Sequence, residues 1–189
     1  VLGDAIEKLS SDPRAVGRWR PYLNRGEAYF EKGMNDAALR DFDAADAMGD
    51  AGYGLFNRGV TLYLRMRKHA AAIEALDRAE KKGYPDPDLF YQRGLARIAL
   101  MQGREAYTDF DHAIGRNVAP PMVWIAMMHR GMIGADIGDP ALAVRDLEQA
   151  IPNVDDARAA RVALGLAYVR AGNPVKAKEL LTESLPQTP

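Results

Sequence analysis

The sequence predicts an all-α fold built from pairs of helices that repeat along the chain. The first observation is a glycine that recurs at intervals of 33 to 37 residues, as Gly26, Gly59, Gly94, Gly131 and Gly165. A period of this length is typical of stacked units of supersecondary structure. The second observation is an alanine twelve or thirteen residues after each glycine, followed four positions later by a large apolar residue. The third is a helix-start signal in the break between these two stretches.

Each unit is expected to contain two helices that cross closely at its glycine. In the first unit Ala38 follows Gly26 by twelve residues, Phe42 follows Ala38 by four, and Ala45 follows Phe42 by three and Ala38 by seven. Residues at these spacings share one side of a helix. The small residues let two backbones approach, and the large residue fills the remaining gap. The stretch around each glycine is then the first helix of its unit, and the alanine-containing stretch is the second.

Turn signals separate the two helices of a unit. GMND occurs at 33–36, GDPA at 138–141 and GNPV at 172–175. In the last two, Asp139 and Asn173 are predicted N-caps, because each precedes a proline at the first helical position, where no backbone N–H is needed.

These residues resemble the tetratricopeptide repeat, whose pattern over about 34 residues contains an aromatic residue, leucine-glycine, tyrosine, alanine, phenylalanine, alanine and proline. Tyr22 and Tyr29 complete the pattern in the first unit, whereas Arg97 and Gly134 replace the tyrosine in the third and fourth. The resemblance implies a right-handed superhelical solenoid of antiparallel helix pairs, with about five units and an N-terminal half unit. The units are expected at 19–52, 53–86, 87–123, 124–157 and 158–189, without a separate capping helix. Residues 1–18 would be a remnant helix of a preceding repeat or an N-terminal cap.

Arginine precedes the glycine in four units, where the repeat pattern has leucine: Arg25, Arg58, Arg93 and Arg130. Aspartates lie sixteen residues after three of them, at Asp41, Asp109 and Asp146. In the fifth unit both positions are leucine, and in the second the nearest acid is Glu74. We expect ion pairs that join the two helices of a unit, because a half-buried guanidinium needs a carboxylate to offset its desolvation. The alternative is a row of arginines that grips an acidic ligand.

Composition and motifs exclude several functional classes. The formal net charge of -1 gives no basic excess for nucleic acid or an anionic membrane. The longest apolar runs, such as VWIAMM at 123–128, are far shorter than the ~20 residues of a spanning helix. The absence of cysteine suits a reducing cytoplasm and a bacterial periplasm equally.

No catalytic, cofactor or metal constellation is predicted. The three histidines lie in different units without the HExxH spacing of a zinc site. Asp41, Asp43, Asp46 and Asp50 resemble a calcium loop but lack its glycine and distal glutamate, so a solvated helix face is the preferred interpretation.

The expected function is a non-catalytic scaffold that binds a protein or peptide. Residues three before, one after and four after each repeat glycine share one side of the first helix, called here the first-helix face. By resemblance to the family, this face lines a concave groove. Its members are Leu23, Glu27, Phe30, Phe56, Val60, Tyr63, Tyr91, Leu95, Ile98, Met128, Met132, Ala135, Val162, Leu166 and Val169.

Phe56, Tyr63, Tyr91, Leu95 and Met132 are expected to form an exposed apolar strip for a helix or an extended hydrophobic peptide. Two residues before the glycines, a polar edge follows at Asn24, Asn57, Gln92 and His129, suited to bonding with a peptide backbone. The cationic residues with which some family members clamp a carboxylate are absent from this face.

Three alternatives stay open at this point. The apolar residues of the first-helix face could be consumed in packing adjacent units. The chain could instead self-assemble through uncapped terminal repeats. An enzyme or regulator whose active domain lies outside this chain is the more distant possibility.

Overall fold

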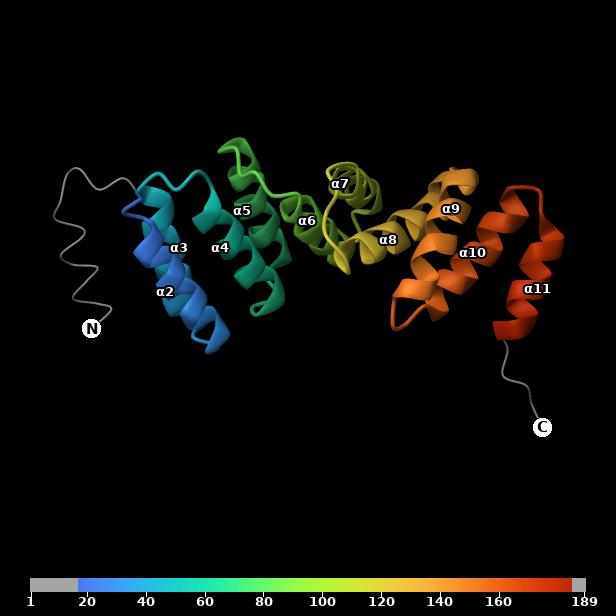
Figure 1. Ribbon diagram of the computed structural model, residues 1–189, viewed down its shortest axis with the longest axis horizontal. Coiled ribbons are helices and arrows are strands. Elements are labelled where there is room, and N and C mark those ends of the chain that lie inside the picture. The colour runs from blue at the N-terminus through green and yellow to red at the C-terminus, as the bar shows by residue number, and fades with distance from the viewer. Residues whose placement is uncertain (1–16, 185–189) are drawn as a thin grey trace. The chain divides into compact units, whose positions relative to one another are not determined.

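The computed structural model describes residues 17–184, which contain ten α-helices and one short 3-10 helix (Figure 1). The predicted all-α fold is confirmed. The helix expected over 1–18 lies almost entirely outside the described residues, as do 185–189. The chain divides into two compact units, one up to Leu100 and the other from Met101.

The first unit contains five helices that pack consecutively in antiparallel pairs. They are α2 (Arg20–Glu31), α3 (Asn35–Ala47), α4 (Tyr53–Leu64), α5 (His69–Lys81) and α6 (Asp88–Ala99). Helices α2 and α3 pair, α4 packs against both α3 and α5, and α6 packs against α5. The first helices α2, α4 and α6 also contact one another in that order.

The second unit continues the same alternation. It contains α7 (Gly103–Gly115), α8 (Met122–Ile137), α9 (Pro140–Ala150), η1 (Ile151–Asn153), α10 (Arg158–Arg170) and α11 (Pro174–Ser184). Helix α8 packs against α7, α9 and α10, and α10 packs against α9 and α11. Within the described residues, no helix is both long and apolar enough to cross a membrane.

The repeat glycines stand where two helices cross closely. A Cβ atom on Gly26 would lie 2.6 Å from the ring of Phe42, and one on Gly131 would lie 2.7 Å from the Leu147 side chain. Gly59 meets Leu76 in the same way, at 2.7 Å. These distances are shorter than van der Waals contact, so only glycine fits, as expected. The same role for Gly94 and Gly165 stays a prediction.

The turn before the second helix of each pair contains one left-handed residue, two positions before that helix begins. Gly138 takes this conformation with a φ of 102°. Arg67 and Met101 take it without being glycine, with φ values of 52° and 60°. As predicted, Asp139 accepts a hydrogen bond from the N–H of Leu142 at 3.2 Å and caps α9. Asn173 caps α11 in the same way through the N–H of Lys176 at 3.2 Å.

Candidate functional site

In the first unit, the first-helix face is largely used for packing. Phe56 stacks on Tyr84 with ring centroids 4.5 Å apart, and Tyr63 contacts the His69 ring at 5.5 Å. Tyr91, expected in the exposed strip, is only 7% exposed, and burial is the main cause that raises its pKa to about 12. This correction arises because α6 packs against α4 as well as α5. Half-buried positions complete the face of α4 and α6: Val60, Leu95 and Ile98.

Between α2 and α4 the packing leaves little room for a ligand. The cavity lined by Phe30, Val60 and their neighbours holds about 30 Å³. This is the volume of about one water molecule. Helices α2 and α4 are therefore closely packed along this face.

In the second unit, α10 presents the first-helix face to solvent. Val162, Leu166 and Val169 are 62%, 38% and 53% exposed. On the neighbouring helix α8, Met128 and Met132 are half-buried against the core that includes Leu147, Leu164 and Tyr168. The most exposed apolar part of the first-helix face thus lies on α10.

The expected polar edge is heterogeneous. Asn24 is exposed, whereas the Asn57 amide donates a hydrogen bond to Glu27 at 3.2 Å. The side-chain oxygen of Gln92 is buried and has no hydrogen-bond partner among the described residues. His129 stacks on Phe110 with centroids 5.4 Å apart, and burial lowers the pKa of its imidazole. Of these four side chains, Asn24 is exposed and the other three are half-buried.

The arginines before the repeat glycines serve structure. Arg25 donates two hydrogen bonds to Asp41, at 2.6 and 2.7 Å, and thereby joins α2 to α3. Arg130 binds Asp146 in the same two-pronged way, at 2.6 and 2.8 Å, with the two residues 6% and 1% exposed. These two predicted pairs are present. The third, between Arg93 and Asp109, stays a prediction.

Three arginines bind the second helix of the preceding repeat, and these contacts were not predicted from the sequence. Arg58 binds Asp43 at 2.8 Å, Arg93 binds Asp77 at 2.6 Å, and Arg130 binds Asp111 at 2.6 Å. A signal was present, because all three aspartates directly follow the large apolar residue of the second helix. At the matching position before the fifth repeat, Glu148 accepts a hydrogen bond from Tyr168 instead.

The acidic series at the end of α3 also needs correction, because it is not a solvated face. Asp41 and Asp43 bind arginines, and Asp46 pairs with Arg78 at 3.3 Å and with Lys82. Asp50 is completely buried and accepts hydrogen bonds from the N–H groups of Gly52 and Gly54 at the start of α4. The carboxylates of this series thus join neighbouring helices, and Asp50 holds the first turn of α4, to which Gly54 belongs.

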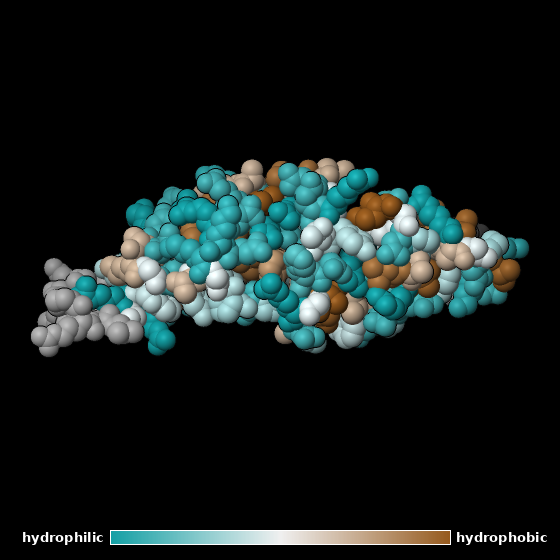
Figure 2. Space-filling model, turned by 90° about the horizontal axis from the view of Figure 1, so that it is seen from above, coloured by the Kyte–Doolittle hydropathy of each residue, from teal (hydrophilic) through white to brown (hydrophobic). Residues whose placement is uncertain are grey.

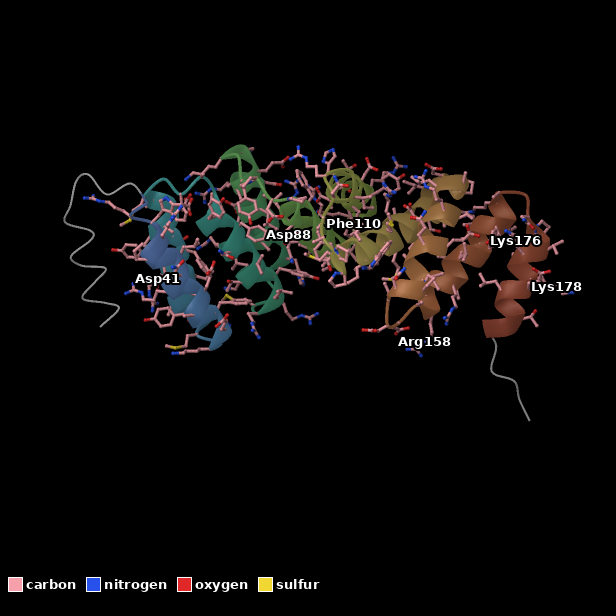
Figure 3. All side chains as sticks on the ribbon, in the orientation of Figure 1. Asp41, Asp88, Phe110, Arg158, Lys176 and Lys178 are labelled. Atoms are coloured by element: carbon pink, nitrogen blue, oxygen red, sulfur yellow. The ribbon has the colours of Figure 1, made fainter. Side chains whose placement is uncertain are left out.

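The described surface is rich in polar and charged side chains. The face shown in Figure 2 is mainly hydrophilic, and its hydrophobic residues form separate patches. Figure 3 shows polar and charged side chains along all the described helices, with Asp41 on α3 and Arg158 at the start of α10. No group of three or more metal-binding side chains occurs among residues 17–184.

Comparisons with known proteins match this architecture. A family model described as tetratricopeptide repeat matches residues 57–107 and 130–189, more than half of the chain. Among solved structures, YrrB, described as a TPR protein with an unusual peptide-binding site, is 21% identical with a TM-score of 0.79, covering 97% of this chain and 90% of that one. A MamA protein is also 21% identical, with a TM-score of 0.71 and coverage of 88% and 90%.

MamA from Desulfovibrio magneticus RS-1 is 16% identical, with a TM-score of 0.69, and the match covers 89% of this chain and 94% of that one. No curated protein sequence matches significantly. The likeness to the solved structures concerns the fold, and the family model matches from within α4 to the first turn of α7 and again from within α8 onward. The chain belongs to the tetratricopeptide repeat family.

Proposed function

We propose that this chain is a non-catalytic scaffold that holds an apolar helix or an extended hydrophobic peptide of a partner protein on its first-helix face. Protein binding is typical of the family, and YrrB is described as having a peptide-binding site. The observation that carries the proposal is the exposure of Val162, Leu166 and Val169 on α10. Several exposed apolar residues in one line are informative, whereas single ones are normal on any surface.

The first unit supports the proposal in a more limited way. Val60, Leu95 and Ile98 keep part of their side chains exposed, so a bound segment would bury additional apolar surface there. Burial of apolar area is the main source of affinity in such contacts. The half-buried methionines of α8 add side chains that adapt their shape to a partner.

The ion pairs argue against the alternative in which a row of arginines grips an acidic ligand. Arg25, Arg58 and Arg130 already bind carboxylates of the chain itself. An acidic ligand would have to displace these carboxylates from the arginines. The displaced aspartates would then have no charge partner. Arg130 would then leave Asp146 buried without its charge partner, which is strongly unfavourable.

Self-assembly through α11 receives less support. The surface pocket on this helix is lined by Val175, Lys178, Glu179 and Thr182, of which one is apolar. Among the described side chains of α11, Val175 is the exposed large apolar one, so this helix shows no row of exposed apolar residues like that of α10. Light scattering over a concentration series distinguishes self-assembly from binding of a partner segment. Self-assembly requires that the average molecular mass increases with protein concentration.

Affinity capture with the full chain tests the proposal. Bait proteins are the unchanged chain, the triple variant Val162→Ser, Leu166→Ser, Val169→Ser, and the matched control Val175→Ser on α11, where Val175 is 66% exposed. We expect a partner that the triple variant loses and the control retains, with the same helical circular dichroism in all three. Equal capture by the triple variant would contradict binding on this face.

A further inference from the structure

The exposed stripe on α10 has the geometry of one helix face. Val162, Leu166 and Val169 are four and three residues apart, so they lie on the same side of the helix. The opposite side is formed by Leu164 and Ala167, which are 4% and 0% exposed and anchor α10 to the core. The stripe is therefore held on a rigid element, and a partner can meet it without any rearrangement of α10.

Basic side chains surround this stripe. Helix α10 contains Arg158, Arg161 and Arg170 and no acidic residue, and all three arginines are exposed. Arg158 lies one turn before Val162 in line with the stripe, and the other two flank it, because successive residues are about 100° apart around a helix. Figure 3 labels Arg158 at the N-terminal end of α10.

These arginines are available to a ligand, unlike those before the repeat glycines. Arg158 pairs with Asp156 at 3.1 Å, but the two side chains are 87% and 67% exposed. Such an exposed pair is weak and exchanges readily with another carboxylate. Other first helices carry acids on or beside their faces, such as Glu27 on α2, Asp88 on α6 and Asp136 on α8.

We propose that the first-helix face of α10 selects an acidic amphipathic segment of a partner protein, with apolar residues at helical spacing and Asp or Glu flanking them. The proposal rests on the function proposed above and specifies the partner's chemistry through charge complementarity. The apolar stripe supplies affinity, and the arginines supply orientation and selectivity against basic segments. Arg158 and Arg170 are twelve residues apart, about 18 Å along a helix, which corresponds to about twelve residues of a helical ligand.

The test begins with a random displayed peptide library selected on the full chain. Selected peptides are synthesised, and their Kd is measured by fluorescence anisotropy at low and high salt. Each is compared with a charge-reversed version in which Lys replaces its acidic residues. The variant Arg158→Gln, Arg161→Gln, Arg170→Gln is compared with a control of the same net charge, Arg104→Gln, Arg145→Gln, Lys178→Gln, on α7, α9 and α11.

We expect the selected peptides to be rich in acidic and apolar residues. Their Kd should weaken about tenfold in the α10 arginine variant, since three exposed pairs of about 0.5 kcal/mol each sum to about this factor. The control should change Kd less than about twofold, and high salt should reduce the difference between variants. Charge-reversed peptides should bind the unchanged chain more weakly, a comparison that does not depend on the folding of any variant.

Two results would overturn the inference and have different meanings. If peptides are selected without acidic bias, and charge reversal leaves their Kd unchanged, the charge selectivity is wrong while the scaffold function stands. If no peptide binds the unchanged chain more tightly than the Val162→Ser, Leu166→Ser, Val169→Ser variant, the binding face itself is wrong, and both proposals fall together.

Discussion

Replacing Gly131 by alanine should destabilise the second unit. The new Cβ would lie 2.7 Å from Cγ of Leu147 and 3.3 Å from the backbone oxygen of Ala143. Leu147 is fully buried, so it cannot move aside into solvent. Overpacking of this kind costs about 1 to 3 kcal/mol, against a gain of about 1 kcal/mol in helix propensity. We expect a net loss of about 1 kcal/mol in the free energy of unfolding, measured by urea denaturation with circular dichroism.

Gly134 on the same helix provides the control. A Cβ there would meet its nearest neighbours, among them Ala143 and Tyr107, at 3.6 Å, which is ordinary contact. Gly134→Ala should therefore stabilise the chain by about 0.5 to 1 kcal/mol through helix propensity alone. The difference between the unfolding free energies of the two variants measures the cost of the close helix crossing at Gly131. Equal effects of both substitutions would refute the assignment of Gly131 to that crossing.

Three further predictions follow from the same contacts. Asp146→Ala should cost about 2 to 3 kcal/mol, because it removes the two hydrogen bonds from the buried Arg130 guanidinium to Asp146 and leaves it with the exposed Asp111, whereas Asp111→Ala should cost at most about 1 kcal/mol; urea denaturation compares the two variants. Met101→Gly should raise the unfolding free energy by about 1 kcal/mol, because Met101 is 92% exposed and holds a φ of 60° that strains non-glycine residues. Since burial lowers the pKa of His129 in the folded chain, the unfolded chain binds more protons, so stability should fall as pH drops below about 6.5, and His129→Phe should flatten this dependence.

The features predictable from the sequence were those that recur within one repeat. The distance from Gly131 to Leu147 is set by two adjacent helices and a short turn, so spacing alone indicates their contact. The Arg130–Asp146 pair is predictable for the same reason. Pairs between repeats, such as Arg58 with Asp43, require comparison of one second helix with the next first helix. The sequence signal for these pairs is an acidic residue directly after the large apolar residue of each second helix.

Exposure along the first-helix face was not predictable from the pattern. Tyr91 and Val162 hold the same register position, three residues before a repeat glycine, yet one is 7% and the other 62% exposed. The difference arises from the neighbouring helices that cover each flank. Apolar spacing indicates that a side is hydrophobic, but it does not indicate whether another helix or a partner covers it.

The most direct test of the scaffold function is methyl NMR on the chain with labelled valine and leucine, titrated with the captured partner or a selected peptide. Val162, Leu166 and Val169 report on the proposed binding face, and Val175 on α11 is an internal control of similar exposure. The proposal predicts that the methyl signals of the first three shift while those of Val175 stay in place. Shifts confined to Val175, with the three α10 residues unchanged, would contradict it.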